Sequence, residues 1–196
     1  MTVTIAPPRF PSLVADLPLT RRALAFAAAR HEGQRREADH APFILHPLEV
    51  AQLLRGRDCR DEIVAAAVLH DIVEDTGVSP AELEQRFGGE VARLVEVLTE
   101  PSPLGSYRER KARLRGAVAD AGEDALVIYA ADKVAKTREL RMTLARGDRR
   151  TPDTAVLEHY WASLDLLEAR MVDHPLVQQL RFELETLELL PPQAGE

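Results

Sequence analysis

The chain has 196 residues, enough for one domain with a substantial core, and its net charge of −7 argues against general nucleic-acid binding. Apolar residues make up 45% of the chain but aromatic residues only 5%, a composition that favours packed helices over strands. No apolar run approaches the roughly 20 residues that span a bilayer, and the N-terminus lacks the pattern of a signal peptide. The lone Cys59 excludes an internal disulfide and fits a reducing cytosol, so we expect a cytoplasmic protein.

The expected elements are helices almost throughout. Residues 1–18 are Pro-rich and aperiodic, which predicts a surface arm before a single domain at 19–190. Thr151-Pro152 is expected to cap the penultimate helix, and the segments 34–45 and 101–105 are expected loops. Apolar periodicity with start and stop signals predicts helices at 19–33, 46–55, 61–73, 80–87, 90–98, 107–121, 124–145, 153–172 and 175 to about 190. Since no segment alternates with period two, we predict an all-α, compact multi-helix bundle.

A cluster of charged side chains ends the third expected helix. The apolar run 63–69 is followed directly by His70-Asp71-Ile72-Val73-Glu74-Asp75. Charges at the end of a buried helix are costly unless they surround a cation or line a polar cleft. At helical spacing these four ionisable groups share one end of the helix, with His70 and Asp71 as metal-ligand types and Glu74 and Asp75 as acid/base groups one turn further on. A solvated helix end is the alternative interpretation.

Two further residues have the chemistry of partner ligands. His46 opens the second helix, and Asp132 lies within the apolar run 126–134, where an unpartnered aspartate is rare. Two histidines and two aspartates would form a ligand set without sulfur. Such a set suits Mn, Fe, Zn or Mg and argues against a structural zinc.

Positive charges are grouped although the chain is acidic. The groups lie at 30–36, at 108–115 and at 133–141, and they include Arg36, Arg110, Lys111, Lys133 and Lys136. Next to a metal site these groups could accept a small polyanion. For the 108–115 run, a solvated helix face is an equally good interpretation.

With these residues placed, the chain resembles the HD-superfamily metal-dependent phosphohydrolases, and most of all the (p)ppGpp hydrolase domains of RelA/SpoT proteins and the small alarmone hydrolases. The resemblance covers about 23–140 and leaves the helices at 152–190 outside this core. It rests on five segments in the right order, which are Ala-Arg-His-Glu-Gly-Gln-Arg-Arg at 29–36, Pro-Phe-Ile-Leu-His-Pro at 42–47, Leu-His-Asp-Ile-Val-Glu-Asp-Thr at 69–76, Phe-Gly-Gly-Glu-Val-Ala-Arg-Leu-Val at 87–95 and Ala-Ala-Asp-Lys at 130–133.

The resemblance implies roles for the metal ligands, the acid pair and Arg36. It makes His46, His70, Asp71 and Asp132 the ligands of one divalent metal, usually Mn²⁺, and Glu74 and Asp75 the catalytic acid pair. It places Arg36 on the guanine base. Lys133, Lys136, Arg110 and Lys111 are the candidates for binding phosphates. The implied activity is removal of pyrophosphate from the 3′ position of (p)ppGpp, a small nucleotide polyphosphate.

The substrate-facing positions depart from the family pattern. Glu37 stands where the family commonly has Lys, Lys136 replaces an Asn that contacts the nucleotide, and Glu139 replaces Thr or Asp. An HD-type phosphatase acting on another nucleotide or dinucleotide is therefore the first alternative. A catalytically silent nucleotide-binding module is the second, and the retained acid pair weighs against it.

Overall fold

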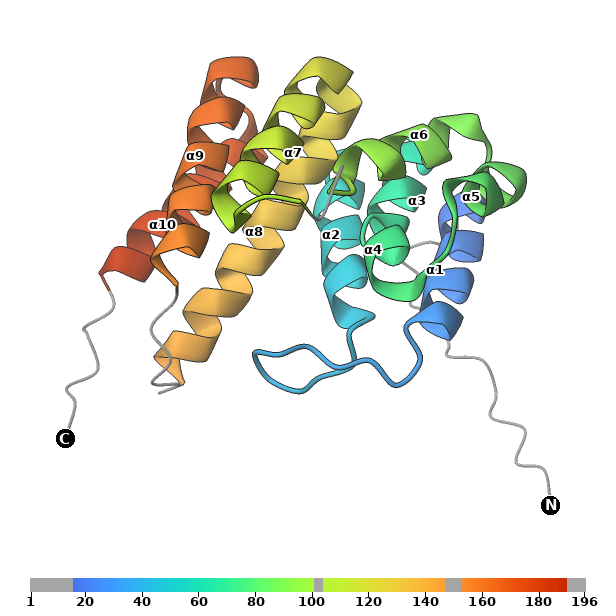
Figure 1. Cartoon of the computed structure of the whole chain (residues 1–196), viewed down its shortest axis with the longest axis horizontal. Coiled ribbons are helices and arrows are strands. Elements are labelled where there is room, and N and C mark those ends of the chain that lie inside the picture. Colours follow the sequence, from blue (N-terminus) through green and yellow to red (C-terminus); the bar gives the residue numbers. More distant parts are fainter. Residues whose placement is uncertain (1–15, 101–103, 147–152, 190–196) are drawn as a thin grey trace.

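The computed structural model describes residues 16–100, 104–146 and 153–189, and this part of the chain forms ten α-helices and no strand (Figure 1). The all-α prediction is thereby confirmed. None of the described helices is both long enough and apolar enough to cross a membrane. The helices are α1 (Pro18–Arg30), α2 (Leu45–Arg55), α3 (Asp61–Leu69), α4 (Ile72–Thr76), α5 (Pro80–Phe87), α6 (Gly89–Leu98), α7 (Tyr107–Ala121), α8 (Glu123–Ala145), α9 (Thr154–Arg170) and α10 (Pro175–Glu188).

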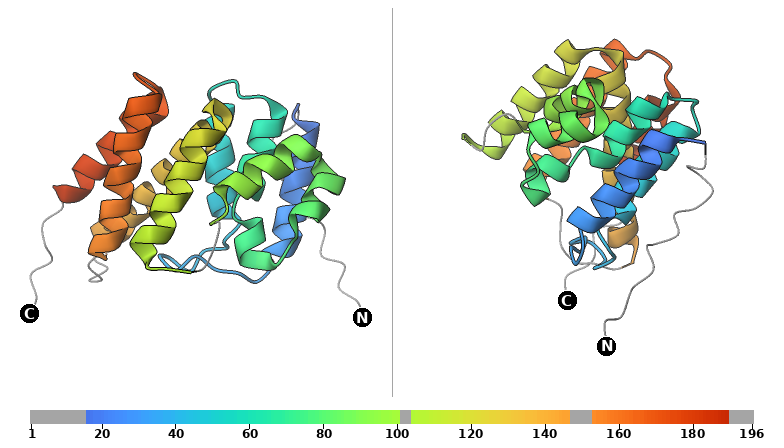
Figure 2. Two further views of the ribbon diagram at one scale, coloured as in Figure 1. Left: turned by 45° about the horizontal axis from the view of Figure 1, so that its top comes forward. Right: turned by 90° about the vertical axis from the view of Figure 1, so that its right-hand side faces the viewer.

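The helices form two groups that share α8. Helices α1 to α6 gather on one side, and α7, α9 and α10 gather on the other, as the left view of Figure 2 also shows. Helix α8 packs against α2, α3 and α6 from the first group and against α7, α9 and α10 from the second. Any side chain in the middle of α8 is therefore close to both groups.

The sequence of α8 explains its central position. Every residue from Ala125 to Ala135 is buried, including Asp132 and Lys133. Small alanines at 125, 130, 131 and 135 let neighbouring helices approach closely, while Ile128 and Val134 fill the space between them. A helix that is apolar on all sides is stable only in the interior, so this segment carries its one aspartate into the core.

The third expected helix, at 61–73, is broken into two. Helix α3 ends at Leu69, His70 and Asp71 form a turn, and α4 runs from Ile72 to Thr76 before Gly77 adopts a left-handed conformation with φ of 71°. Aspartate is a poor helix former, and Asp71 has a ψ of −4°, which differs from helical values. The backbone N–H of Asp75 still donates to the carbonyl of Asp71 at 3.0 Å, so α4 continues within one turn and holds the acid pair close to the histidine.

The other boundaries agree within one to three residues where the chain is described. Helices α5 and α7 have the predicted bounds, whereas α1 already ends at Arg30 and the chain then turns through Gly33, whose φ is +81°. An isolated antiparallel bridge between Arg35 and Pro42 shapes the following loop. Residues 1–15 of the expected arm, the expected cap at Thr151-Pro152 and the expected helix end at Leu190 lie outside the described residues.

The start of α1 is held by a side chain from α3. The backbone N–H groups of Leu19 and Thr20 each donate to a carboxylate oxygen of Asp61 at 2.8 Å. The Thr20 hydroxyl donates to the same carboxylate at 2.6 Å. These bonds satisfy helix N–H groups that have no partner within α1, and they fasten α1 to the beginning of α3.

A candidate metal centre beside an open pocket

The four predicted ligands come from separate elements and meet at one place. His46 lies in the first turn of α2, His70 and Asp71 lie in the turn between α3 and α4, and Asp132 lies near the middle of α8. The two histidines and Asp132 are buried, and each offers one ligand atom within 4.8 Å of the other two. Residues far apart in the chain are thus gathered by the packing of α2, α3 and α8.

The distances between the ligand atoms define the centre. Nε2 of His46 lies 3.3 Å from Nε2 of His70 and 3.2 Å from Oδ1 of Asp132. Oδ2 of Asp71 lies 3.0 Å from Nε2 of His70 and 3.4 Å from Nε2 of His46. All four side chains therefore direct a donor atom toward a common point.

The second ring nitrogen of His70 is held by the backbone. Nδ1 of His70 lies 2.7 Å from the carbonyl oxygen of Ala67. Because a carbonyl only accepts, Nδ1 carries a proton, so the neutral form of the ring presents the lone pair of Nε2 to the centre. A backbone acceptor behind a histidine is the usual arrangement for a metal-binding imidazole.

The buried carboxylate of Asp132 is only partly satisfied by the protein. Its Oδ2 accepts from the ammonium of Lys133 at 2.7 Å. Its Oδ1 accepts no hydrogen bond of good geometry from the described residues, although Nζ of Lys136 lies 3.2 Å away. Burial raises the pKa of Asp132, but Lys133, Lys136 and the two histidines outweigh it and hold this pKa well below its usual range. The group is therefore an anionic donor with one oxygen available to a cation.

The donor set fits a divalent metal. Two imidazole nitrogens and two carboxylates, with no thiolate, suit borderline-hard divalent ions of the first transition row. The orphaned Oδ1 of Asp132 and the fixed tautomer of His70 are the features expected of such a site.

The predicted acid pair lies on α4, and its two members face different surroundings. Asp75 lines the neighbouring pocket, and its backbone carbonyl accepts from Nε2 of Gln34 at 3.1 Å. Burial raises the pKa of Asp75, and the nearby charge of Asp71 raises it further. Among the causes of this raised pKa, the neighbouring Glu74 contributes less than burial and Asp71 do. Glu74 instead accepts from the backbone N–H of Glu100 at 2.5 Å.

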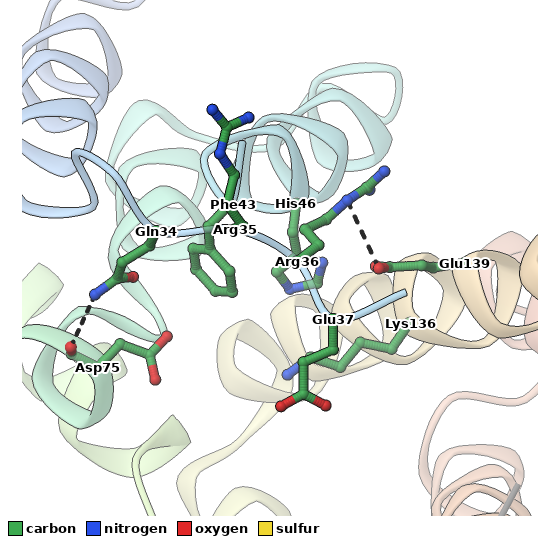
Figure 3. A pocket seen from close by; sticks show the side chains of 9 residues that line it. All are labelled: Gln34, Arg35, Arg36, Glu37, Phe43, His46, Asp75, Lys136 and Glu139. Carbon is green, nitrogen blue, oxygen red and sulfur yellow. Dashed lines mark hydrogen bonds and ion pairs between the residues drawn. The ribbon is translucent and has the colours of Figure 1, made fainter. Parts of the chain in front are cut away.

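An open pocket adjoins the metal centre (Figure 3). Its volume is about 420 Å³, which suits a nucleotide-sized ligand. Lys136 and Glu139 reach it from α8, and Asp75 reaches it from α4. The pocket is lined by Gln34, Arg35, Arg36, Glu37, Phe43, His46, Asp75, Lys136 and Glu139. Since His46 is shared with the metal centre, a ligand in this pocket would lie next to that centre.

Of the candidate substrate-binding residues, some line the pocket and others lie outside it. Arg36 and Lys136 line the pocket, where Nε of Arg36 donates to Asp39 at 3.0 Å and lies 3.6 Å from a carboxylate oxygen of Glu139. Lys133 is buried behind the centre, with its ammonium over the ring of Tyr129. Arg110 and Lys111 do not line the pocket and both pair with Glu100.

Gln34 and Phe43 line the pocket without having been predicted. Oε1 of Gln34 accepts from Nδ1 of His31 at 2.7 Å, while Nε2 of Gln34 donates to the backbone carbonyl of Asp75. The ring of Phe43 packs against that of His31, with centroids 4.7 Å apart. Both residues lie within the segments that carry the family resemblance. Their place in those segments was the only feature of the sequence that could have indicated a role at the site.

Comparisons with known proteins agree with this geometry. The family model described as "HD domain" matches residues 23–155. The MESH1 protein of Xenopus tropicalis, named a guanosine-3′,5′-bis(diphosphate) 3′-pyrophosphohydrolase, is 33% identical over 76% of this chain and 83% of its own length. Human MESH1, of the same name, is 35% identical over 62% of this chain and 69% of its own length.

Solved structures that resemble this chain include a ppGpp hydrolase as well. A structure described as a metazoan ortholog of SpoT that hydrolyses ppGpp aligns with a TM-score of 0.75 and 26% identity over 93% of this chain and 100% of its own. A protein of Listeria monocytogenes EGD-e aligns with a TM-score of 0.67 and 27% identity over 74% of this chain and 97% of its own. The chain therefore belongs to the HD-domain family and, within it, to the group formed by the MESH1 proteins.

Proposed function

We propose that this chain is a metal-dependent hydrolase that removes pyrophosphate from the 3′ position of guanosine-3′,5′-bis(diphosphate). The observation that carries the proposal is the buried convergence of His46, His70 and Asp132 within 4.8 Å, beside a pocket that shares His46. The names of the MESH1 relatives support this substrate. The catalytic unit of the proposal is the domain at 19–190.

His46, His70, Asp71 and Asp132 would hold the metal, and we propose Mn²⁺ as the ion. When bound, a divalent cation supplies activation of water and neutralisation of phosphate charge. The protein contributes the orientation of the ligands. Ala67 fixes the ring of His70, and Lys133 fixes the carboxylate of Asp132.

Asp75 and Glu74 would act as the catalytic pair, with Asp75 transferring the proton and Glu74 orienting the attacking water. Asp75 faces the pocket, and its raised pKa suits a group that accepts a proton from the attacking water and passes it on. Glu74 lies on the same short helix and is bound to the backbone of Glu100, so it would fix the edge of α4 and orient the water from that side.

The pocket would bind the nucleotide. Arg36 is half-buried in the pocket wall, where its guanidinium plane would pack on the base. Lys136 is the pocket lysine nearest the metal ligands and would contact the phosphate that is attacked. Arg110 and Lys111 would act at a distance, on phosphate that extends past Glu100. Lys133 would act through Asp132.

A second candidate substrate is another nucleotide or a dinucleotide such as NADPH. Glu37 and Glu139 both line the pocket, and two carboxylates disfavour a highly charged polyphosphate at that wall. Because of this observation, the experiment below also tests substrates of an HD-type phosphatase that acts on another nucleotide or dinucleotide.

The test is turnover by the Mn²⁺-loaded protein on ppGpp, nucleoside monophosphates and NADPH. We expect pyrophosphate release from ppGpp, and its loss in Asp71→Ala. Asp120→Ala, an exposed aspartate on α7, is the matched control and should retain full activity. Turnover of another compound with ppGpp intact would refute the ppGpp assignment and keep a hydrolase, whereas no turnover on the panel would refute the activity.

A further inference from the structure

The ammonium of Lys136 lies at the edge of the metal centre. Its Nζ is 3.2 Å from Oδ1 of Asp132 and 3.7 Å from Oδ1 of Asp71. Oδ1 of Asp132 also lies 3.2 Å from Nε2 of His46 and 3.4 Å from Nε2 of His70. The lysine therefore lies against both carboxylates of the proposed ligand set, and in Asp132 it lies at the oxygen that faces both histidines.

Lys136 differs from the second lysine at the centre in its freedom to move. Lys133 donates to the other oxygen of Asp132 at 2.7 Å and is enclosed by α8 and its neighbours, with Nζ 4.7 Å from the centroid of the Tyr129 ring. The side chain of Lys136 is 35% exposed and lines the open pocket. Figure 3 shows it extending from α8 into that space. Of these two lysines, only Lys136 borders open space into which its ammonium can turn.

A bound metal would oppose this position of the ammonium. The buried Asp132 and the largely buried Asp71 need positive charge nearby, and Lys136 is the lysine that lies against both of them. A divalent ion on Oδ1 of Asp132 would be separated from Nζ by only a few ångströms, and like charges at that distance in a poorly solvated site repel strongly. The pocket side offers the ammonium Glu37 and Glu139, and in the complex it would offer substrate phosphate.

We propose that Lys136 is a tethered cation that balances Asp71 and Asp132 when the metal is absent and turns into the pocket when the metal binds. The proposal deepens the function above and rests on its metal centre. Lys136 then weakens metal binding in the absence of substrate. It also couples metal to substrate, because the displaced ammonium is directed to where phosphate would lie.

The test compares three variants by calorimetric titration of the metal-free full chain with Mn²⁺. Lys136→Gln removes the charge, and we expect its Kd for Mn²⁺ to fall by about tenfold or more. Lys136→Arg keeps the charge and should bind as the wild type does. Arg35→Gln is the matched control, because it removes a positive charge from the same pocket at a residue that has no ion pair with Asp71 or Asp132; its Kd should be unchanged.

A second measurement needs no metal. In EDTA, Lys136→Gln should melt several degrees below the wild type and below Arg35→Gln, because two buried carboxylates lose a counter-ion.

The outcomes separate this proposal from the proposed function. Mn²⁺ affinity in Lys136→Gln equal to or weaker than that of the wild type overturns the tethered cation and leaves the hydrolase intact. Tighter binding in this variant, with no turnover of ppGpp by the wild type, supports the tethered cation and overturns the substrate assignment. Absence of Mn²⁺ binding in all variants overturns both.

Discussion

His70 has different partners on its two ring nitrogens, and the pair of contacts sets its protonation. Nδ1 donates to the carbonyl of Ala67, while Nε2 faces Asp71 and Asp132 at 3.0 and 3.4 Å. Burial lowers the pKa of His70, but the two carboxylates raise it to about 10 in the metal-free protein. Metal ligation requires the neutral ring, so metal and proton compete for the same nitrogen.

This competition predicts a pH dependence of the metal-free protein. The folded pKa of about 10 lies above the ordinary value of 6.5, so His70 contributes stability that is complete below pH 6.5 and is lost as the pH rises toward 10. The melting temperature in EDTA should therefore fall between pH 6.5 and 9.5. In His70→Gln the slope should be smaller, and an equal slope in both proteins would contradict the assignment.

Asp75 is the residue whose loss should separate chemistry from metal binding. It lines the pocket and lies outside the ligand cluster of His46, His70 and Asp132. Asp75→Asn should lower kcat by about 100-fold or more, because a proton acceptor is removed, while the Kd for Mn²⁺ stays within a few fold. Steady-state kinetics and calorimetry measure the two effects. Asp120→Asn controls for the substitution itself, and a normal kcat in Asp75→Asn would refute its role.

At the scale of elements, the site depends on short segments at helix ends. The turn between α3 and α4 presents His70 and Asp71, the first turn of α2 presents His46, and only Asp132 comes from a helix interior. Helix ends can direct side chains along the helix axis and into a common space. Contacts between elements, such as Asp61 with α1, fix the far end of α3, the helix that His70 and Asp71 follow.

Removal of the Asp61 carboxylate should destabilise the junction of α1 and α3. Asp61→Ala removes the acceptor of two backbone N–H groups and one hydroxyl, which should lower the free energy of unfolding by about 2 kcal/mol. Urea unfolding measures the change. The neighbouring Glu62→Ala removes only a surface pairing with Arg60 at 3.7 Å and should cost less than about 0.5 kcal/mol. Equal effects of both substitutions would contradict this account.

At the scale of the whole molecule, the metal centre joins the two groups of helices. His46 and His70 belong to the group α1 to α6, whereas Asp132 lies on α8, which α7, α9 and α10 cover. An ion bound to all of them would stabilise the arrangement of the groups as well as the site.

Metal binding should accordingly raise the thermal stability of the entire chain. At a free Mn²⁺ concentration of about 100 times Kd, binding to the native state alone adds about 2.7 kcal/mol, which corresponds to a rise in Tm of roughly 5 to 10 °C. Differential scanning fluorimetry measures it, and EDTA should reverse it. In Asp71→Asn the rise should be largely lost. A full rise in that variant would show that the ion binds elsewhere.

Much of this could be predicted from the sequence, for identifiable reasons. Two features of the sequence indicated the site: an aspartate inside an apolar run, and a hexapeptide dense in charge that follows another apolar run. Both are unusual because charged residues are rarely placed in or beside buried helices. Ligand chemistry joined His46 and Asp132 to the hexapeptide, and the resemblance agreed with that assignment. The break at His70 and Asp71 was not predicted, because apolar periodicity continues across it through Ile72 and Val73.

The surroundings of the site were harder to predict, since they depend on contacts between distant segments. Local periodicity does not indicate that Arg110 and Lys111 pair with Glu100. It also does not indicate that Gln34 contacts Asp75. Lys133 and Lys136 are separated by three positions on one helix, yet one is enclosed and the other reaches the pocket. Only the packing of α8 decides between them.

The burial of α8 on all sides has a consequence for how the molecule unfolds. Since both groups of helices cover the same apolar helix, neither group can detach without exposing the run from Ala125 to Ala135 to water. Partly unfolded states are thereby penalised. The chain should lose its structure in one cooperative transition, with calorimetric and van't Hoff enthalpies equal, even though the ribbon divides visibly in two.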